Sequence, residues 1–217
     1  MVEILLIRHG ETAWNAERRM QGHLDIGLNA DGLHQAAALA RALQDEPIDA
    51  IYSSDLQRAL QTAQAVAGPR GMPIGLEPGL RERCYGIFEG LLYGELAQVH
   101  PHAYEQWQRR DLDARYPSGV HQAETLREFS ARSVDAIDRL AAAGNHRRIA
   151  LFTHGGVLEC AYRAATGTSI QQARDFEILN ASINRLHWNA GQLRLVDWAD
   201  VGHLARFDAG ALDEIIR

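Results

Sequence analysis

Short apolar runs alternate along this chain with longer segments whose apolar residues recur at helical spacing, and this alternation narrows the fold more than any other feature. The runs have the length and composition of buried strands, at residues 3–7, 49–53, 74–76 and 148–153. Helical spacing predicts helices over residues 29–43, 56–67 and 124–143, and from residue 154 to about residue 166. Strands alternating with helices are typical of an α/β fold, in which helices pack against a mostly parallel central sheet.

The remaining segments extend this pattern. Residues 93–110 have helical spacing that is interrupted at Pro101, and residues 183–188 and 192–198 form a predicted closing hairpin. The sequence contains no internal repeat and no Gly/Ser-rich or Pro-rich linker. Domains usually hold roughly 100–200 residues, so we expect a single domain over residues 1–217.

Local signals predict where the helices begin and end. Asn29 or Asp31 is expected to cap the helix over residues 29–43, because short polar side chains accept hydrogen bonds from the first turn. Gly68 and Pro69 are expected to stop the helix over residues 56–67, and Gly144 the longest helix.

The charged residues exclude several function classes. All 22 basic residues are arginine, so Schiff-base chemistry and a P-loop lysine are excluded. The formal net charge of −6 argues against a nucleic-acid-binding surface. An anionic substrate would therefore have to be attracted by a local cluster of arginines.

Cysteine content and hydropathy indicate the compartment. Two cysteines, Cys84 and Cys160, are too few for a disulfide scaffold or a cysteine-rich zinc module. The apolar run near the N-terminus is too short for a signal peptide, and no stretch approaches the roughly 20 apolar residues of a membrane span. We therefore expect a cytoplasmic protein with no membrane partner.

Polar clusters follow three of the predicted strands. They are Arg8-His9-Gly10, residues 53–55 with Arg58, and His154-Gly155-Gly156. Since ligands of parallel sheets bind beyond the carboxyl ends of the strands, we expect these clusters to converge. Guanidinium forks match phosphate oxygens, glycines at a helix N-terminus favour an anion, and an imidazole can act as nucleophile. The pattern predicts a phosphoryl-transfer site that needs no metal or cofactor, because arginines supply the positive charge.

Each of these residues has a plainer interpretation when taken alone. A single histidine beside a strand is usually a hydrogen-bonded structural residue, and Arg58 on a helix is usually solvated. Glu82, between Arg81 and Arg83, is usually one member of a surface ion pair. His100 and His102 form a His-x-His pair, for which a solvated loop is favoured over a metal site. The functional interpretation therefore rests on the residues acting together.

Four ordered motifs resemble the histidine phosphatase superfamily, the phosphoglycerate mutase-like family. They are LLIRHGETAWNAERRMQGHLDIGLNADGLHQA at residues 5–36, IYSSDLQRALQTAQ at 51–64, LRERCYGIFEG at 80–90 and LFTHGGVLE at 151–159. The segment at residues 200–204 is also similar to one common in that family. The resemblance spans nearly the whole chain and implies a three-layer α/β/α fold.

The resemblance also implies catalytic roles. His9 would attack phosphorus and form a phosphohistidine, and Glu82 would protonate the leaving oxygen and then activate water. Arg8, Arg58 and His154 would bind the phosphoryl oxygens and stabilise the transition state.

Further positions are expected to bind the phosphate or line the pocket. Asn15 matches the family asparagine that reaches the phosphate, Gln21 and Gly22 match a pair that lines the pocket, and Gly155 begins the anion-binding helix. Cys84 and Glu159 depart from the family pattern. No role is expected for Cys84, whereas the acidity of Glu159 could tune substrate choice.

Two activities share the phosphohistidine step. Against a phosphoglycerate mutase, the chain is short for such an enzyme, it lacks lysine for the mutase lid motif, and residues 117–132 look more like the phosphatases. We therefore expect a phosphomonoesterase for a small phosphorylated metabolite, with a cofactor-dependent mutase as the alternative. A non-catalytic phosphate-binding module is the alternative from another class. Trp188 and Trp198 fit a dimer surface or a core, so a monomer and a homodimer both stay open.

Overall fold

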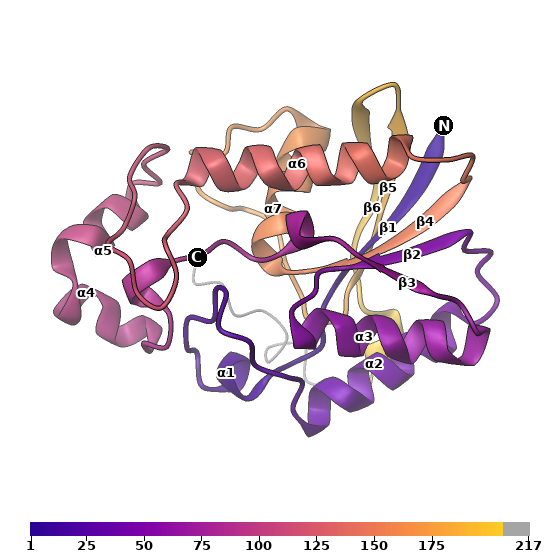
Figure 1. The fold of residues 1–217 in the computed structure, drawn as a ribbon, viewed down its shortest axis with the longest axis horizontal. Helices are drawn as coiled ribbons and strands as arrows, with labels where there is room; N and C mark the ends of the chain where they lie inside the picture. The colour runs from indigo at the N-terminus through magenta and orange to yellow at the C-terminus, as the bar shows by residue number, and fades with distance from the viewer. Residues whose placement is uncertain (206–217) are drawn as a thin grey trace.

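The computed structural model describes residues 1–205, which form a six-stranded mixed sheet flanked by helices (Figure 1). The strand order is β3-β2-β4-β1-β5-β6. The four parallel strands are β1 (Val2–Arg8), β2 (Ala50–Ser53), β3 (Ile74–Leu76) and β4 (Arg148–Thr153). The antiparallel strands are β5 (Ile183–Asn189) and β6 (Gln192–Asp200). The predictions of a mostly parallel sheet and a closing hairpin are confirmed.

Helices cover both faces of this sheet (Figure 1). Successive side chains of a strand point to opposite faces, so alternate residues of β1 enter different cores. Leu5 packs with α2 (Ala30–Leu43) and α3 (Gln57–Ala67), whereas Leu6 packs with α6 (Leu126–Ala142) and α7 (Gly155–Thr166). Because β1 and β4 are buried on both sides, they read as continuous apolar runs. The three-layer arrangement is as expected.

A smaller cluster lies away from the sheet, at the left of Figure 1. Its short helices are η3 (Gly86–Phe88), η4 (Tyr93–Glu95), α4 (Leu96–Val99) and α5 (Pro101–Gln108). The turn η2 (Pro78–Leu80) instead packs against α6, with Leu80 in the main core. The buried centre of the smaller cluster is Phe88, whose ring lies 4.8 Å from that of Tyr116. The predicted interruption at Pro101 is confirmed, since α4 ends at Val99 and α5 begins at the proline.

The predicted end of α3 is confirmed, since the α-helix ends at Ala67. A short 3₁₀ turn, η1 (Gly68–Arg70), follows it, and the left-handed turn comes at Gly71, with φ 62°. Pro69 is tolerated because the first turn of a helix leaves its N–H groups unpaired. A short helix α1 (Ala13–Ala16), capped by Thr12, was not predicted, because one turn is too short to show periodicity. The final short element is η5 (Gly202–Leu204).

Several other sequence expectations have structural outcomes. Asn29 caps α2, since its side chain accepts from the Gly32 N–H at 2.8 Å. Trp188 and Trp198 both pack, partly buried, against the core on the α6–α7 side of the sheet. Within residues 1–205, no helix is long and apolar enough to cross a membrane. The expected domain, residues 1–217, includes residues 206–217, which lie outside the described part of the chain.

Candidate active site

The parallel register brings the three polar clusters to one edge of the sheet. Strands β1, β4 and β2 are neighbours, and Arg8 of β1 lies opposite Thr153 of β4. The rings of His9 and His154, which follow these strands, have centroids 5.2 Å apart. Arg58, in the first turn of α3, donates from Nε to His154 Nδ1 at 3.2 Å. Residues 145 positions apart in the sequence therefore share one site.

His9 is held as a neutral imidazole with a defined tautomer. Its Nδ1 lies 2.7 Å from the carbonyl of Gly10, which can only accept, so Nδ1 carries the proton and Nε2 keeps its lone pair. Burial, followed by the charges of Arg58 and Arg8, lowers the pKa of His9 well below its ordinary value. A buried, neutral Nε2 between two guanidinium groups is suited to nucleophilic attack on an anion.

His154 carries its proton on the other nitrogen. Arg58 donates to Nδ1, so Nε2 bears the hydrogen and donates to Ser54 Oγ at 2.9 Å. Burial is the main cause that lowers the pKa of His154 well below its ordinary value, and the charge of Arg58 adds to it. The two adjacent imidazoles therefore differ: His9 keeps a lone pair on Nε2, whereas His154 has both ring nitrogens in hydrogen bonds.

Arg8 and Arg58 line the same cavity although both are almost fully buried, at 3% and 1% exposure. Arg58 also donates to the carbonyls of Gly22 at 2.8 Å and Leu24 at 3.1 Å. Arg8 donates from Nη1 to the carbonyl of Ile178 at 2.7 Å. These backbone acceptors fix the direction of each guanidinium without neutralising its charge.

The loop after α1 supplies the next predicted residues. Gly22 has φ 53°, and a Cβ there would overlap the carboxylate of Glu89, so both space and backbone conformation favour glycine. Gln21 lines the cavity and accepts from Thr12 Oγ1 at 3.0 Å. Asn15 does not line the cavity, but its Nδ2 is buried with no hydrogen-bond partner among residues 1–205. That amide is a donor available to an anion.

Glu82 also lines the cavity. Its Oε1 accepts from the Arg83 N–H at 2.8 Å, and its Oε2 accepts from the Gly156 N–H at 3.0 Å. Gly155 and Gly156 begin α7, so the carboxylate sits at a helix N-terminus, where a negative charge is stabilised. The interpretation of Glu82 as a member of a surface ion pair is therefore wrong; Arg81 instead pairs with Asp55.

The cavity holds about 220 Å³, the size of a small metabolite. Besides Arg8 and Arg58, Arg83, Arg110 and Arg174 line it. Glu159, also in its wall, accepts from Arg110 at 2.5 Å and from Arg163 at 2.9 Å. Its aromatic lining is Tyr85, Tyr93, Trp107 and Phe129.

The remaining sequence candidates lie elsewhere. Cys84 is buried, and desolvation raises the pKa of its thiol to about 12, as suits a packing residue. Arg109 is exposed and pairs with Glu105, whereas its neighbour Arg110 lines the cavity. Among the described residues, His100 and His102 belong to no group of three ligands that could hold a metal ion.

Sequence reasoning missed several residues that shape the site. Ser54 was noted only as part of a cluster, yet its Oγ accepts from His154 Nε2 at 2.9 Å. His23 donates to the carbonyl of Glu82 at 2.8 Å, and Arg132 donates to the same carbonyl at 3.2 Å. No sequence signal marks these contacts, because each joins segments that are distant along the chain.

Comparison with known proteins places this geometry in a family. The family model for the histidine phosphatase superfamily (branch 1) matches residues 4–201. The chain belongs to this superfamily. The structure brings His9 of its Arg-His-Gly motif and His154 together at the sheet edge.

Relatives within the superfamily have different activities. A metal-independent phosphoserine phosphatase of Arabidopsis thaliana is 38% identical over 208 residues, covering 94% of this chain and 84% of the relative. A probable phosphoglycerate mutase GpmB of Escherichia fergusonii is 33% identical over 219 residues, covering both chains completely. A solved phosphoserine phosphatase mutant from Entamoeba histolytica, in complex with phosphoserine, has a TM-score of 0.81 and 27% identity, covering 94% of this chain and all of the other. Phosphatases and a mutase are thus both similar to this chain.

Proposed function

We propose that this protein is a metal-independent phosphomonoesterase that hydrolyses a small phosphorylated metabolite through a phosphohistidine on His9. One observation carries the proposal. His9, whose Nε2 keeps its lone pair, lines one cavity together with the buried arginines Arg8 and Arg58 and with Glu82. A nucleophile, an anion clamp and a proton donor are the parts that phosphoryl transfer requires.

In the first step, His9 Nε2 would attack phosphorus and the bond from phosphorus to the ester oxygen would break. The electron pair of that bond goes to the leaving oxygen, which takes a proton from Glu82. Arg8 and Arg58, which line the cavity, would hold the phosphoryl oxygens, and Asn15 Nδ2 is a further donor. These fixed donors stabilise the charge that develops in the transition state. His154 does not line the cavity and would act by orienting Arg58, whose Nε donates to its Nδ1.

In the second step, the Glu82 carboxylate would take a proton from a water molecule while the oxygen of that water attacks phosphorus. The nitrogen–phosphorus bond breaks, its electron pair returns to His9 Nε2, and inorganic phosphate leaves. The same group is acid in one step and base in the next, so one carboxyl serves both. Arg8 and Arg58 would supply the positive charge that a metal ion supplies in other phosphatases.

The cavity also bears on the substrate. Arg83, Arg110 and Arg174 also line it, together with Tyr85 and Trp107. Arginine forks match carboxylates as well as phosphates. We therefore favour a phosphate ester whose other end carries a carboxylate. The solved phosphatase in complex with phosphoserine supports this choice.

Phosphoglycerate mutase is the second candidate, because the Escherichia fergusonii chain with that probable activity matches over its full length. A mutase returns the phosphoryl group to an organic acceptor, whereas a phosphatase passes it to water. Both routes need the same phosphohistidine. Only the acceptor separates them.

A hydrolysis assay in EDTA tests the proposal. Wild type, His9→Ala and the control His34→Ala, at an exposed helix position, are compared on an aryl phosphate, on phosphoserine and on 3-phosphoglycerate with and without 2,3-bisphosphoglycerate. We expect hydrolysis by wild type and the control, and a loss of roughly 10³-fold or more in His9→Ala. An acid-labile phosphoenzyme should form only where His9 is present.

The other outcomes separate the alternatives. Rapid isomerisation of 3-phosphoglycerate with little hydrolysis would establish the mutase. Phosphate binding without turnover of any substrate would favour the non-catalytic module. Wild-type turnover in His9→Ala would remove the nucleophile assignment.

A further inference from the structure

The loop that carries Glu82 has no regular secondary structure. It runs between η2, which ends at Leu80, and η3, which begins at Gly86. The Glu82 carboxylate contacts backbone N–H groups of Arg83 and Gly156, so its position depends on where the loop backbone is fixed. A group that transfers a proton must be held within about 0.5 Å of its productive position. Something outside the loop has to supply that rigidity.

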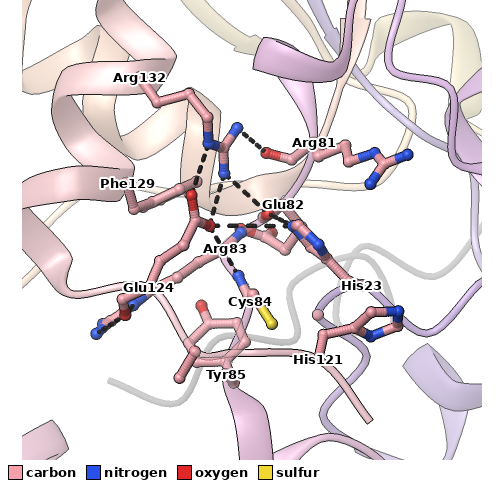
Figure 2. A network of polar contacts seen from close by, with 12 residues as sticks. His23, Arg81, Glu82, Arg83, Cys84, Tyr85, His121, Glu124, Phe129 and Arg132 are labelled. Atoms are coloured by element: carbon pink, nitrogen blue, oxygen red, sulfur yellow. Dashed lines mark hydrogen bonds and ion pairs between the residues drawn. The ribbon is translucent and has the colours of Figure 1, made fainter. Parts of the chain in front are cut away.

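Arg132 of α6 reaches across to this loop and binds its carbonyl groups (Figure 2). Its Nη1 donates to the carbonyls of Gly79 at 2.9 Å and Arg81 at 3.1 Å, and its Nη2 donates to that of Glu82 at 3.2 Å. One guanidinium thus binds three carbonyls within four residues. These contacts hold the loop on the N-terminal side of the Glu82 side chain.

Glu124 holds the other side of the same loop (Figure 2). Its Oε2 accepts from the Cys84 N–H at 3.0 Å, and its own N–H donates to the Cys84 carbonyl at 3.0 Å. Its carbonyl accepts from Arg83 Nη2 at 2.9 Å. Glu124 therefore fixes the two residues that follow Glu82.

Glu124 and Arg132 also bind each other. Two hydrogen bonds of 2.7 Å join the carboxylate to Nε and Nη2 of the guanidinium, the bidentate geometry that is strongest for this pair. Their side chains are only 19% and 25% exposed, so removing one charge would leave the other partly buried and unpaired. Burial raises the pKa of Glu124, but the hydrogen bonds and charge of Arg132 outweigh it and leave that pKa below its ordinary value.

We infer that the Glu124–Arg132 ion pair is the positioning device for Glu82, and that it governs proton donation to the leaving group without taking part in phosphate binding. Both residues act through the backbone of residues 79–84, so they are positioning residues and not catalytic ones. The inference rests on the proposed role of Glu82 as general acid. It predicts that disturbing the pair slows the hydrolysis only of those substrates whose leaving group needs a proton.

The chain offers a matched control on the same helix. Arg127 and Asp113 form a bidentate pair with distances of 2.8 and 2.9 Å. Their side chains are 60% and 70% exposed, and neither residue lines the cavity. An exposed pair contributes little to stability. Asp113→Asn therefore removes an ion pair from α6 while leaving the Glu82 loop alone.

The test compares two substrates in the full-length enzyme. Dinitrophenyl phosphate has a leaving group that departs as the anion, whereas an alkyl phosphate needs a proton on the departing oxygen. The variants are Glu124→Gln, which keeps the shape of the side chain, Arg132→Lys, Glu82→Gln and the control Asp113→Asn. The readouts are kcat/KM for each substrate and the inhibition constant of inorganic phosphate. The ratio kcat/KM covers the steps up to bond cleavage, so later hydrolysis does not obscure the comparison.

We expect Glu124→Gln and Arg132→Lys to lose about tenfold in kcat/KM on the alkyl ester, part of the 10²–10⁴-fold that a general acid contributes. Loss on dinitrophenyl phosphate should stay within about twofold, and phosphate inhibition should not change, because the clamp of Arg8 and Arg58 is untouched. Asp113→Asn should match wild type on both substrates. Restored alkyl-ester activity in Glu124→Asp, which keeps the charge, would support the same inference if Glu124→Gln folds poorly.

Four results would overturn the inference. Equal losses on both substrates would mean that the pair only supports the fold, and no loss on either would mean that the loop is held without it. If Glu82→Gln shows the leaving-group effect and the Glu124 and Arg132 variants do not, Glu82 stays the acid and only the positioning role fails. If Glu82→Gln itself shows no such effect, the acid assignment fails and the inference fails with it.

Discussion

At the scale of single residues, the site depends on proton placement as much as on residue identity. His9 and His154 are the same residue type at similar depth, yet the Gly10 carbonyl places a proton on one Nδ1 and the Arg58 Nε excludes it from the other. A sequence records two histidines. The neighbours decide that His9 keeps a lone pair on Nε2 and that His154 has both ring nitrogens in hydrogen bonds.

Gly156 illustrates how little space surrounds the Glu82 carboxylate. A Cβ at this position would overlap Glu82 Oε1 and lie 2.8 Å from Phe129 Cζ. In Gly156→Ala the carboxylate has to move, so we expect a loss of about tenfold or more in kcat/KM on an alkyl phosphate and a smaller loss on dinitrophenyl phosphate. The measurement is the ratio of the two rate losses.

A matched glycine controls this prediction. At Gly68 no atom lies within 4 Å of the point that a Cβ would occupy, and φ has an ordinary negative value of −55°, so Gly68→Ala should leave both rates unchanged. An unchanged rate in Gly156→Ala would show that Glu82 can shift without consequence. That result would argue against a demanding geometry for proton transfer.

At the scale of elements, α6 contacts the core, the cavity and the loop that carries Glu82. Phe129 of this helix packs in the core and lines the cavity, and Arg132, one turn later, holds the Glu82 loop. The helix starts with a capping box in which Thr125 Oγ1 accepts from the Glu128 N–H at 3.1 Å and Glu128 Oε2 accepts from the Thr125 N–H at 2.9 Å.

Removing the cap tests its contribution to stability. Thr125→Ala leaves the Glu128 N–H without its side-chain acceptor, so the free energy of unfolding should fall by about 1 kcal/mol. Urea denaturation measures the change, and Ser118→Ala at an exposed loop position is the control. If Thr125→Ala were as stable as wild type, the capping box would contribute nothing beyond what water provides.

At the scale of the whole molecule, the burial of His9 and His154 makes stability depend on pH. The folded pKa values of His9 and His154 lie well below the ordinary value, so on acidification the unfolded chain takes up protons before the folded protein does. The free energy of unfolding therefore has its full value above about pH 6.5. It falls as the pH drops below that value, by up to about 1.4 kcal/mol per pH unit for each histidine.

Denaturation in phosphate-free buffer between pH 7.5 and 5 checks this dependence. His9→Asn and His154→Asn should each show a shallower decline than wild type, and the double variant the shallowest. Curves parallel to that of wild type would mean that neither histidine titrates differently in the folded protein. Phosphate has to be absent, because a bound anion would favour the protonated imidazoles.

How much could be predicted differs between the strands and the Glu82 loop. The apolar run of β1 and the Arg-His-Gly after it predicted a strand that ends in a site, because both signals are local. The proposed role of Glu82 could be predicted only through the family resemblance, since the composition of the surrounding motif is typical of a surface segment. Nothing local marks Glu124 or Arg132, which lie some 40 and 50 residues away from it.

The sequence by itself determined the α/β class, the edge of the sheet where the site lies and the residue types available there, because periodicity and motifs depend on near neighbours in the chain. The tertiary structure alone decided the tautomers of His9 and His154, the entry of Glu82 against α7 and the bracing of its loop by α6. Those features come from hydrogen bonds between segments far apart in sequence. Their geometry exists only once the strands and helices have packed.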